Sequence, residues 1–167
     1  LIDYMLIHQY TSNRDGPEQY QHNNMRGVRR RAPGERFRFF VWDMEYSLWG
    51  ASDDINIDVD VSGSVSHVYA RLRSNEVFRA QYAARAAEHL GPDGALSPAA
   101  SLARWEWRAE EIENAILGES ARWGDADREV PYTRDLEWAE ERRRLTEEYF
   151  PTRSDVLIEQ LRAAGLY

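Results

Sequence analysis

The apolar positions of this chain repeat at helical spacing at its start and again throughout its second half. Ile2, Met5 and Leu6 predict a first helix over residues 1–12. From Val68 onward the chain is predicted to be helical, with capping residues and helix breakers at the boundaries. One helix has its N-cap at Ser74 or Asn75 and ends near Gly91, and the next has its N-cap at Ser97 before Pro98. A third begins at Thr133 or Asp135 and is interrupted at Pro151, and a last one runs from an N-cap at Ser154 to Gly165.

Between these helical parts, the apolar pattern changes to the alternation typical of strands. Residues 25–31 and 35–42 are predicted to form two strands joined by a turn at residues 32–34. Residues 50–66 form a loop with one alternating acidic patch, which is either a short edge strand or an acidic loop. The predicted fold is therefore α+β and mainly α: a helix, a small β-hairpin and a helical bundle, in one domain spanning residues 1–167.

Composition narrows the possible functions. The chain has 167 residues, no cysteine and a net charge of −8, so cysteine catalysis and disulfides are excluded and a general nucleic-acid partner is not expected. No apolar run is long enough for a membrane span. All 21 basic residues are arginine, so chemistry that demands a lysine within these residues is excluded, including the lysine that kinases place on nucleotide phosphates.

Two familiar metal-binding patterns are not met. Asp54, Asn56 and Asp58 begin like a calcium loop, but Val59 stands where the turn glycine belongs and Val65 where the bidentate glutamate belongs. The four histidines show no pair at metal-ligand spacing. The tryptophans of the second half are interpreted as helix-packing residues, with a sugar-binding face as the alternative.

Two aspartates, Asp15 and Asp43, flank the predicted hairpin. A hairpin returns the chain to where it started, so these residues are expected to lie close together in space. Phosphoryl transfer uses such a pair: one carboxylate accepts or orients the proton of the nucleophile, and another holds a metal on the phosphates. On spacing alone, the alternative is two aspartates with no shared task.

The order of elements is that of a protein kinase from its catalytic loop onward: a helix, Asn13-Arg14-Asp15, Asn23-Asn24, a hairpin, and then Trp42-Asp43. On these residues the chain resembles the kinase-like proteins related to spore coat protein H, the CotH family. The resemblance extends over nearly the whole chain, through residues 2–6, 29–31, 37–45, 71–79, 103–125, 149–153 and 164–167.

The resemblance implies an atypical kinase-like fold that uses ATP and Mg²⁺ or Mn²⁺ to phosphorylate Ser on a protein substrate. Asp15 would be the catalytic aspartate, Asp43 the metal-binding aspartate and Asn24 the metal-binding asparagine. Residues 18–22 resemble an insertion, which leaves Asn23 as the alternative to Asn24. Members of the family are often bacterial spore-coat, exported or cell-surface proteins.

The resemblance also implies that these residues are the C-terminal catalytic lobe. The N-terminal lobe, with its lysine and most of the nucleotide pocket, would lie upstream of Leu1, so residues 1–167 alone are expected to be inactive. Two alternatives stay open. One is a scaffold that has kept the kinase architecture and lost transfer, and the other is an unrelated helical domain that binds a partner through its tryptophans.

Overall fold

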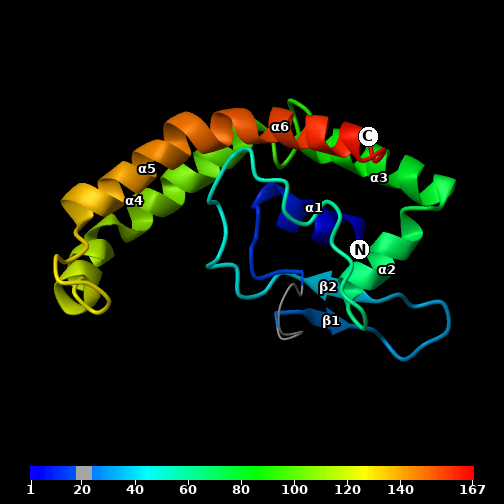
Figure 1. Ribbon diagram of the computed structural model, residues 1–167, viewed down its shortest axis with the longest axis horizontal. Helices are drawn as coiled ribbons and strands as arrows, with labels where there is room; N and C mark the ends of the chain where they lie inside the picture. Colours follow the sequence, from blue (N-terminus) through cyan, green and yellow to red (C-terminus); the bar gives the residue numbers. More distant parts are fainter. Residues whose placement is uncertain (18–23) are drawn as a thin grey trace.

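The structure, a computed structural model, describes residues 1–17 and 24–167 (Figure 1). It is α+β and mainly α, as predicted. No helix among the described residues is long and apolar enough to cross a bilayer. The elements, in chain order, are α1 (Ile2–Tyr10), β1 (Arg26–Val28), β2 (Arg38–Phe40), α2 (Val65–Leu72), α3 (Glu76–Leu90), α4 (Pro98–Trp123), the π-helical turn η1 (Arg134–Trp138), α5 (Ala139–Arg144), the π-helical turn η2 (Leu145–Tyr149) and α6 (Phe150–Ala163).

The predicted hairpin is present, but its strands are shorter than expected. β1 and β2 pair antiparallel over three residues each, with Gly27 opposite Phe39. Phe39 is the hairpin residue that packs toward the core, with its ring 5.7 Å from that of Tyr4. The residues on either side of these strands are exposed and arginine-rich, so they gain no burial that would favour further strand pairing. Of residues 50–66, predicted as a strand or a loop, residues 50–64 form a loop, but Val65 and Ser66 already belong to α2, which Ser64 caps.

Most of the predicted helix caps are confirmed. Asn75, Ser97 and Thr133 each accept a hydrogen bond from a backbone N–H in the first turn of α3, α4 and η1. After α6, Gly165 adopts a positive φ of 70°, and the Leu166 N–H donates to the Leu161 carbonyl at 2.8 Å. Such a left-handed residue ends a helix by redirecting the chain.

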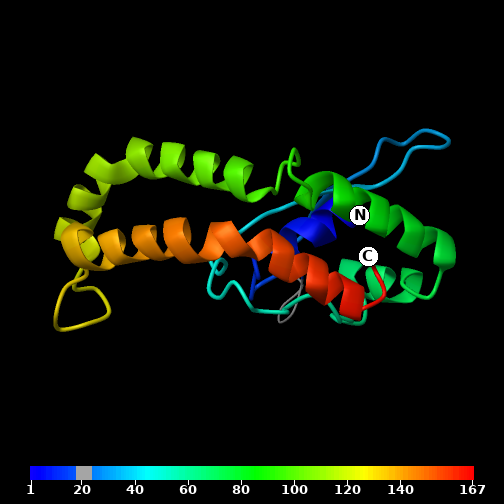
Figure 2. The ribbon, with the colours of Figure 1, turned by 90° about the horizontal axis from the view of Figure 1, so that it is seen from above.

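The predicted break at Pro151 is wrong, and so is the predicted cap at Ser154. Helical structure continues from η1 to the end of α6, and this run lies antiparallel to α4 (Figures 1 and 2). Pro151 is the second residue of α6, and the wider turn η2 ends just before Phe150, so the missing proline N–H falls in the first turn after the change of helical register. Ser154 is buried inside α6, and its Oγ donates to the Leu96 carbonyl at 2.6 Å.

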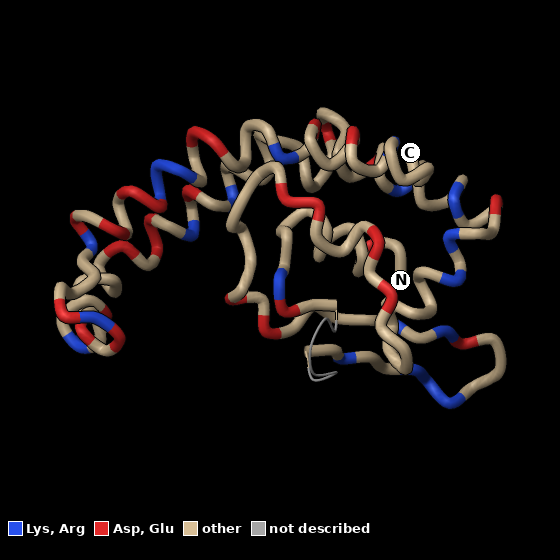
Figure 3. The backbone as a smooth tube through the Cα atoms, in the orientation of Figure 1, with Lys and Arg blue, Asp and Glu red and all other residues tan. Residues whose placement is uncertain are grey.

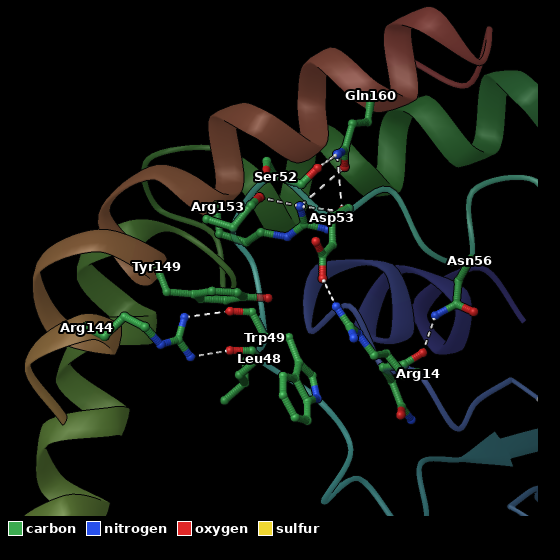
Figure 4. Close-up of polar contacts among 12 residues, drawn as sticks. Arg14, Leu48, Trp49, Ser52, Asp53, Asn56, Arg144, Tyr149, Arg153 and Gln160 are labelled. Atoms are coloured by element: carbon green, nitrogen blue, oxygen red, sulfur yellow. Dashed lines mark hydrogen bonds and ion pairs between the residues drawn. The ribbon is translucent and has the colours of Figure 1, made fainter. Parts of the chain in front are cut away.

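The core joins α1, α2, α3 and α6, and a buried arginine lies within it. The Arg153 side chain is fully buried, and its guanidinium donates to the backbone carbonyls of Tyr10 at 2.8 Å and Ala51 at 2.7 Å, and also to that of Gln9. It also donates to the Asp53 carbonyl at 3.0 Å (Figure 4). Burial lowers the pKa of this guanidinium. Arg153 therefore ties the end of α1 and the loop after the hairpin to α6.

Replacing Arg153 by alanine is expected to lower the free energy of unfolding by about 4 kcal/mol, because four backbone carbonyls lose a charged donor at once. Chemical denaturation measures this change. Arg162→Ala, which removes an exposed arginine from the same helix, is the matched control and should cost less than about 1 kcal/mol. Equal losses in the two variants would show that the buried guanidinium contributes no more than an exposed one.

His8, in α1, is a second buried polar residue. Its ring is edge-on to Tyr4 at 4.4 Å, and its Nδ1 lies 3.1 Å from the Asn13 amide nitrogen. An amide nitrogen can only donate, so Nδ1 accepts and the proton of the neutral ring is on Nε2. Nε2 has no hydrogen-bond partner among the described residues. Burial lowers the pKa of His8 from 6.5 to about 4, so the ring is neutral near pH 7.

This lowered pKa makes stability depend on pH. Between 6.5 and about 4 the unfolded chain binds a proton at His8 that the folded protein does not bind, so the folded state loses stability as the pH falls. The expected loss from His8 between about pH 7 and about pH 4 is about 3 kcal/mol.

The change is measured by denaturant melts at several pH values on the protein and on His8→Gln. The variant keeps an acceptor for Asn13 and does not titrate, so its stability should fall less steeply over this range. Parallel pH curves would show that His8 is not the titrating group.

Candidate functional site

Asp15 lies in the turn that follows α1, where two asparagines hold it. The Asp15 backbone N–H donates to Asn13 Oδ1 at 3.0 Å. The Asn24 amide donates to Asp15 Oδ2 at 2.6 Å and to the Asp15 backbone carbonyl at 3.4 Å. Asn13 and Asn24 are buried and Asp15 is partly exposed. This arrangement fixes the direction of the carboxylate and leaves it accessible from solvent.

Asp43 comes three residues after β2 and is exposed. Its segment lies against the Asp15 turn through two contacts. The Asn13 amide nitrogen is 3.1 Å from the sulfur of Met44, and the Arg14 backbone N–H donates to the Tyr46 carbonyl at 2.8 Å. The structure therefore brings together the two segments that carry the predicted site residues.

Backbone conformations of positive φ occur in these two segments and in the loop that follows them. Among the described residues other than glycine, they occur at Ser12, Asp43, Leu48 and Asn56, with φ between 50° and 72°. Residues with side chains rarely adopt this region, and asparagine and aspartate tolerate it best. Such residues persist where the surroundings hold them and gather at functional sites. This pattern is an independent indication that the loops around Asp15 and Asp43 are a site.

Asn56 shows how the surroundings hold one of these conformations. Its side-chain amide donates to the Asn13 carbonyl at 2.8 Å and to the His8 carbonyl at 3.3 Å, and Gln9 donates to the Asn56 carbonyl at 3.0 Å. Asn56 thus links the loop of residues 50–64 to the turn that carries Asp15. In the sequence, Asn56 belongs only to an incomplete calcium-loop pattern, and no sequence signal indicates that Asn13 supports Asp15.

Two arginines, one from the Asp15 turn and one from α5, contact the segment after Asp43 (Figure 4). Arg14 makes an ion pair with Asp53 at 3.1 Å, and its guanidinium lies 4.9 Å from the centre of the Trp49 ring. Arg144, at the end of α5, donates to the carbonyls of Leu48 at 2.5 Å and Trp49 at 2.6 Å. The loop after the hairpin is therefore held by α5 and α6 as well as by α1.

Two other acidic residues of this loop are used in local contacts. Asp58 pairs with Arg73, and Asp60 accepts from His67 Nδ1 at 2.6 Å. The described residues contain no group of three or more His, Cys, Asp or Glu side chains able to hold a metal. A metal that needs a full set of protein ligands therefore has no ready site in the part of the chain that is described.

A nucleotide-bound Mg²⁺ has different requirements. It is typically held by one or two carboxylates, and substrate phosphates and water complete the octahedron. Asp43 supplies an exposed carboxylate at the edge of the site. Asn24 uses its amide nitrogen on Asp15, so its Oδ1 is the atom suited to coordinate a cation. The residues present fit this kind of metal. Asn23, the alternative to Asn24, and the proposed insertion at residues 18–22 lie outside the described residues.

Of three comparisons with known proteins, the one with family models found a match. Comparisons with curated proteins and with solved structures found no match. The family model described as CotH kinase protein matches residues 1–157, which include α1, the hairpin, both aspartates and the helical run up to the middle of α6. Because this match covers nearly its whole length, the chain belongs to the CotH kinase protein family.

Proposed function

We propose that these residues form the catalytic and metal-binding part of a protein kinase that transfers phosphate from ATP to Ser of a protein substrate. The single observation that carries the proposal is the hydrogen bond from Asn24 to the Asp15 carboxylate, in a turn packed against the Asp43 segment. A solvated loop aspartate does not need a buried asparagine to orient it. Membership of the family supports the same reaction class.

Asp15 has the role of the group that receives the substrate hydroxyl. Its carboxylate accepts from Asn24, and its backbone is fixed by Asn13, so one oxygen can be directed at an incoming proton. Kinases gain most of their rate from positioning and electrostatic stabilisation, and a fixed carboxylate contributes to positioning. Asp15 would orient the serine hydroxyl and accept its proton as the phosphoryl group is transferred.

Asp43 and Asn24 Oδ1 would hold Mg²⁺ or Mn²⁺, which when bound neutralises charge on the phosphates of ATP. Asp43 lies on a segment supported by Asn13, Arg14 and Arg144, so its position is well defined despite its exposure. The chain has no lysine, so a lysine for the nucleotide phosphates would have to come from outside residues 1–167.

The two aspartates have separable roles, which can be tested in the full-length protein that contains these residues. Asp15→Asn should lower kcat by about 10²–10⁴ and leave metal-dependent ATP binding nearly unchanged, because it removes a base and not the phosphate site. Asp43→Asn should abolish both transfer and metal-dependent ATP binding. Asparagine tolerates the left-handed conformation of residue 43, so this change removes charge without adding backbone strain.

Transfer assays with a Ser-containing protein, calorimetry with ATP and metal, and melting curves make the test complete. Asp93→Asn, which neutralises an exposed carboxylate between α3 and α4, is the matched control and should change neither the transfer rate nor the affinity for ATP and metal. If both site variants retain full transfer, the catalytic assignment is wrong. If the unaltered full-length protein binds ATP without transferring phosphate, the scaffold without transfer activity is the correct description.

A further inference from the structure

The hairpin carries a concentration of positive charge that the proposed kinase site does not use. The arginine hairpin is defined here as residues 26–38, and its charged residues are Arg26, Arg29, Arg30, Arg31, Arg36 and Arg38, with Glu35 as the one acidic residue. All six arginines are exposed. The whole chain has a net charge of −8, so this surface opposes the charge of the rest of the molecule (Figure 3).

Apart from Arg26, these charges are largely unneutralised by the residues that the structure describes. Arg30 approaches Glu35 at 4.0 Å, with the Arg30 side chain 82% exposed, which is a weak surface pair. Arg29 lies over the Phe37 ring at 5.8 Å from its centre, and Phe37 is itself exposed. Arg31 and Arg36 have no ion pair with any described residue. Like charges held so close together repel one another, and an anionic partner would relieve that repulsion.

Three of these arginines also line a small hollow on the hairpin. The hollow has a volume of about 220 Å³ and is lined by Val28, Arg30, Glu35, Arg36 and Arg38. Three arginines and one glutamate line the hollow, so its lining stays net positive, and guanidinium groups bind carboxylates through paired N–H donors.

We propose that the arginine hairpin binds an acidic segment of a partner protein. A short segment fits the small extent of the patch. A long polyanion such as a nucleic acid would extend beyond the hairpin and meet the net negative charge of the remaining surface. The binding requires neither ATP nor phosphoryl transfer, so it stands or fails separately from the proposed kinase function.

The test measures the fluorescence anisotropy of a labelled peptide as the protein is added. The peptide has about twelve residues, contains no serine and is rich in Asp and Glu. In the control peptide, Asn and Gln replace the acidic residues. The acidic peptide should bind, the control peptide should not, and binding should weaken as salt rises from about 0.05 M to about 0.5 M. The combined variant Arg30→Gln, Arg36→Gln, Arg38→Gln removes the three arginines that line the hollow and should bind at least about tenfold more weakly.

The matched control carries the same charge change on exposed arginines of α4 and α5, as Arg108→Gln, Arg122→Gln, Arg143→Gln. It should retain binding within about twofold if the hairpin is the site. Melting curves establish that both variants are folded. Equal weakening in the two variants, or no binding of the acidic peptide, overturns the proposal. Binding of a single-stranded oligonucleotide or of anionic lipid vesicles as tightly as the peptide also overturns it, because the hairpin would then be a general anion surface.

Discussion

The buried guanidinium of Arg153 is the interaction on which the arrangement of this protein depends. It reaches from α6 to carbonyls at the end of α1 and to carbonyls in the loop that follows the hairpin. A buried charge is costly unless its donors are satisfied, so those carbonyls must be in place for Arg153 to be buried at all. Tyr149 adds a hydrogen bond to the Tyr10 carbonyl at 2.6 Å, from the turn just before α6.

The candidate site is built on this junction. The turn that carries Asp15 starts where α1 ends, next to the carbonyls that Arg153 holds. Asp53, whose carbonyl accepts from Arg153, uses its carboxylate to pair with Arg14, the residue before Asp15. A chain of contacts thus runs from the core to the site, and the helices α5 and α6 determine where the Asp15 and Asp43 segments meet.

Local features of the fold could be predicted from the sequence, and long-range ones could not. The caps at Asn75, Ser97 and Thr133 depend on a side chain and a backbone N–H within one turn, so sequence alone identifies them. Pro151 was misjudged because a preceding π-helical turn removes the conflict that a proline normally creates in a helix. Arg153 gave no sequence signal, because its partners are backbone carbonyls about 100 to 144 positions away.

The same division holds for the site. Asp15 and Asp43 were identified from their places on either side of a hairpin and from a family resemblance, and their roles remain proposals. The Asn13 and Asn56 supports were missed because their function arises only once the loop after the hairpin folds back onto α1. Asparagine in a turn is too common for its presence alone to indicate such a role.

The central claim is that the Asp15 and Asp43 segments meet around one nucleotide-bound metal. The most direct measurement is a crystal structure of the full-length protein with Mn²⁺ and a non-hydrolysable ATP analogue, in which anomalous scattering locates the metal. The account predicts Mn²⁺ on the Asp43 carboxylate and Asn24 Oδ1, with the Asp15 carboxylate facing the terminal phosphate. A metal bound elsewhere, or Asp15 and Asp43 pointing to opposite sides of the domain, would contradict it.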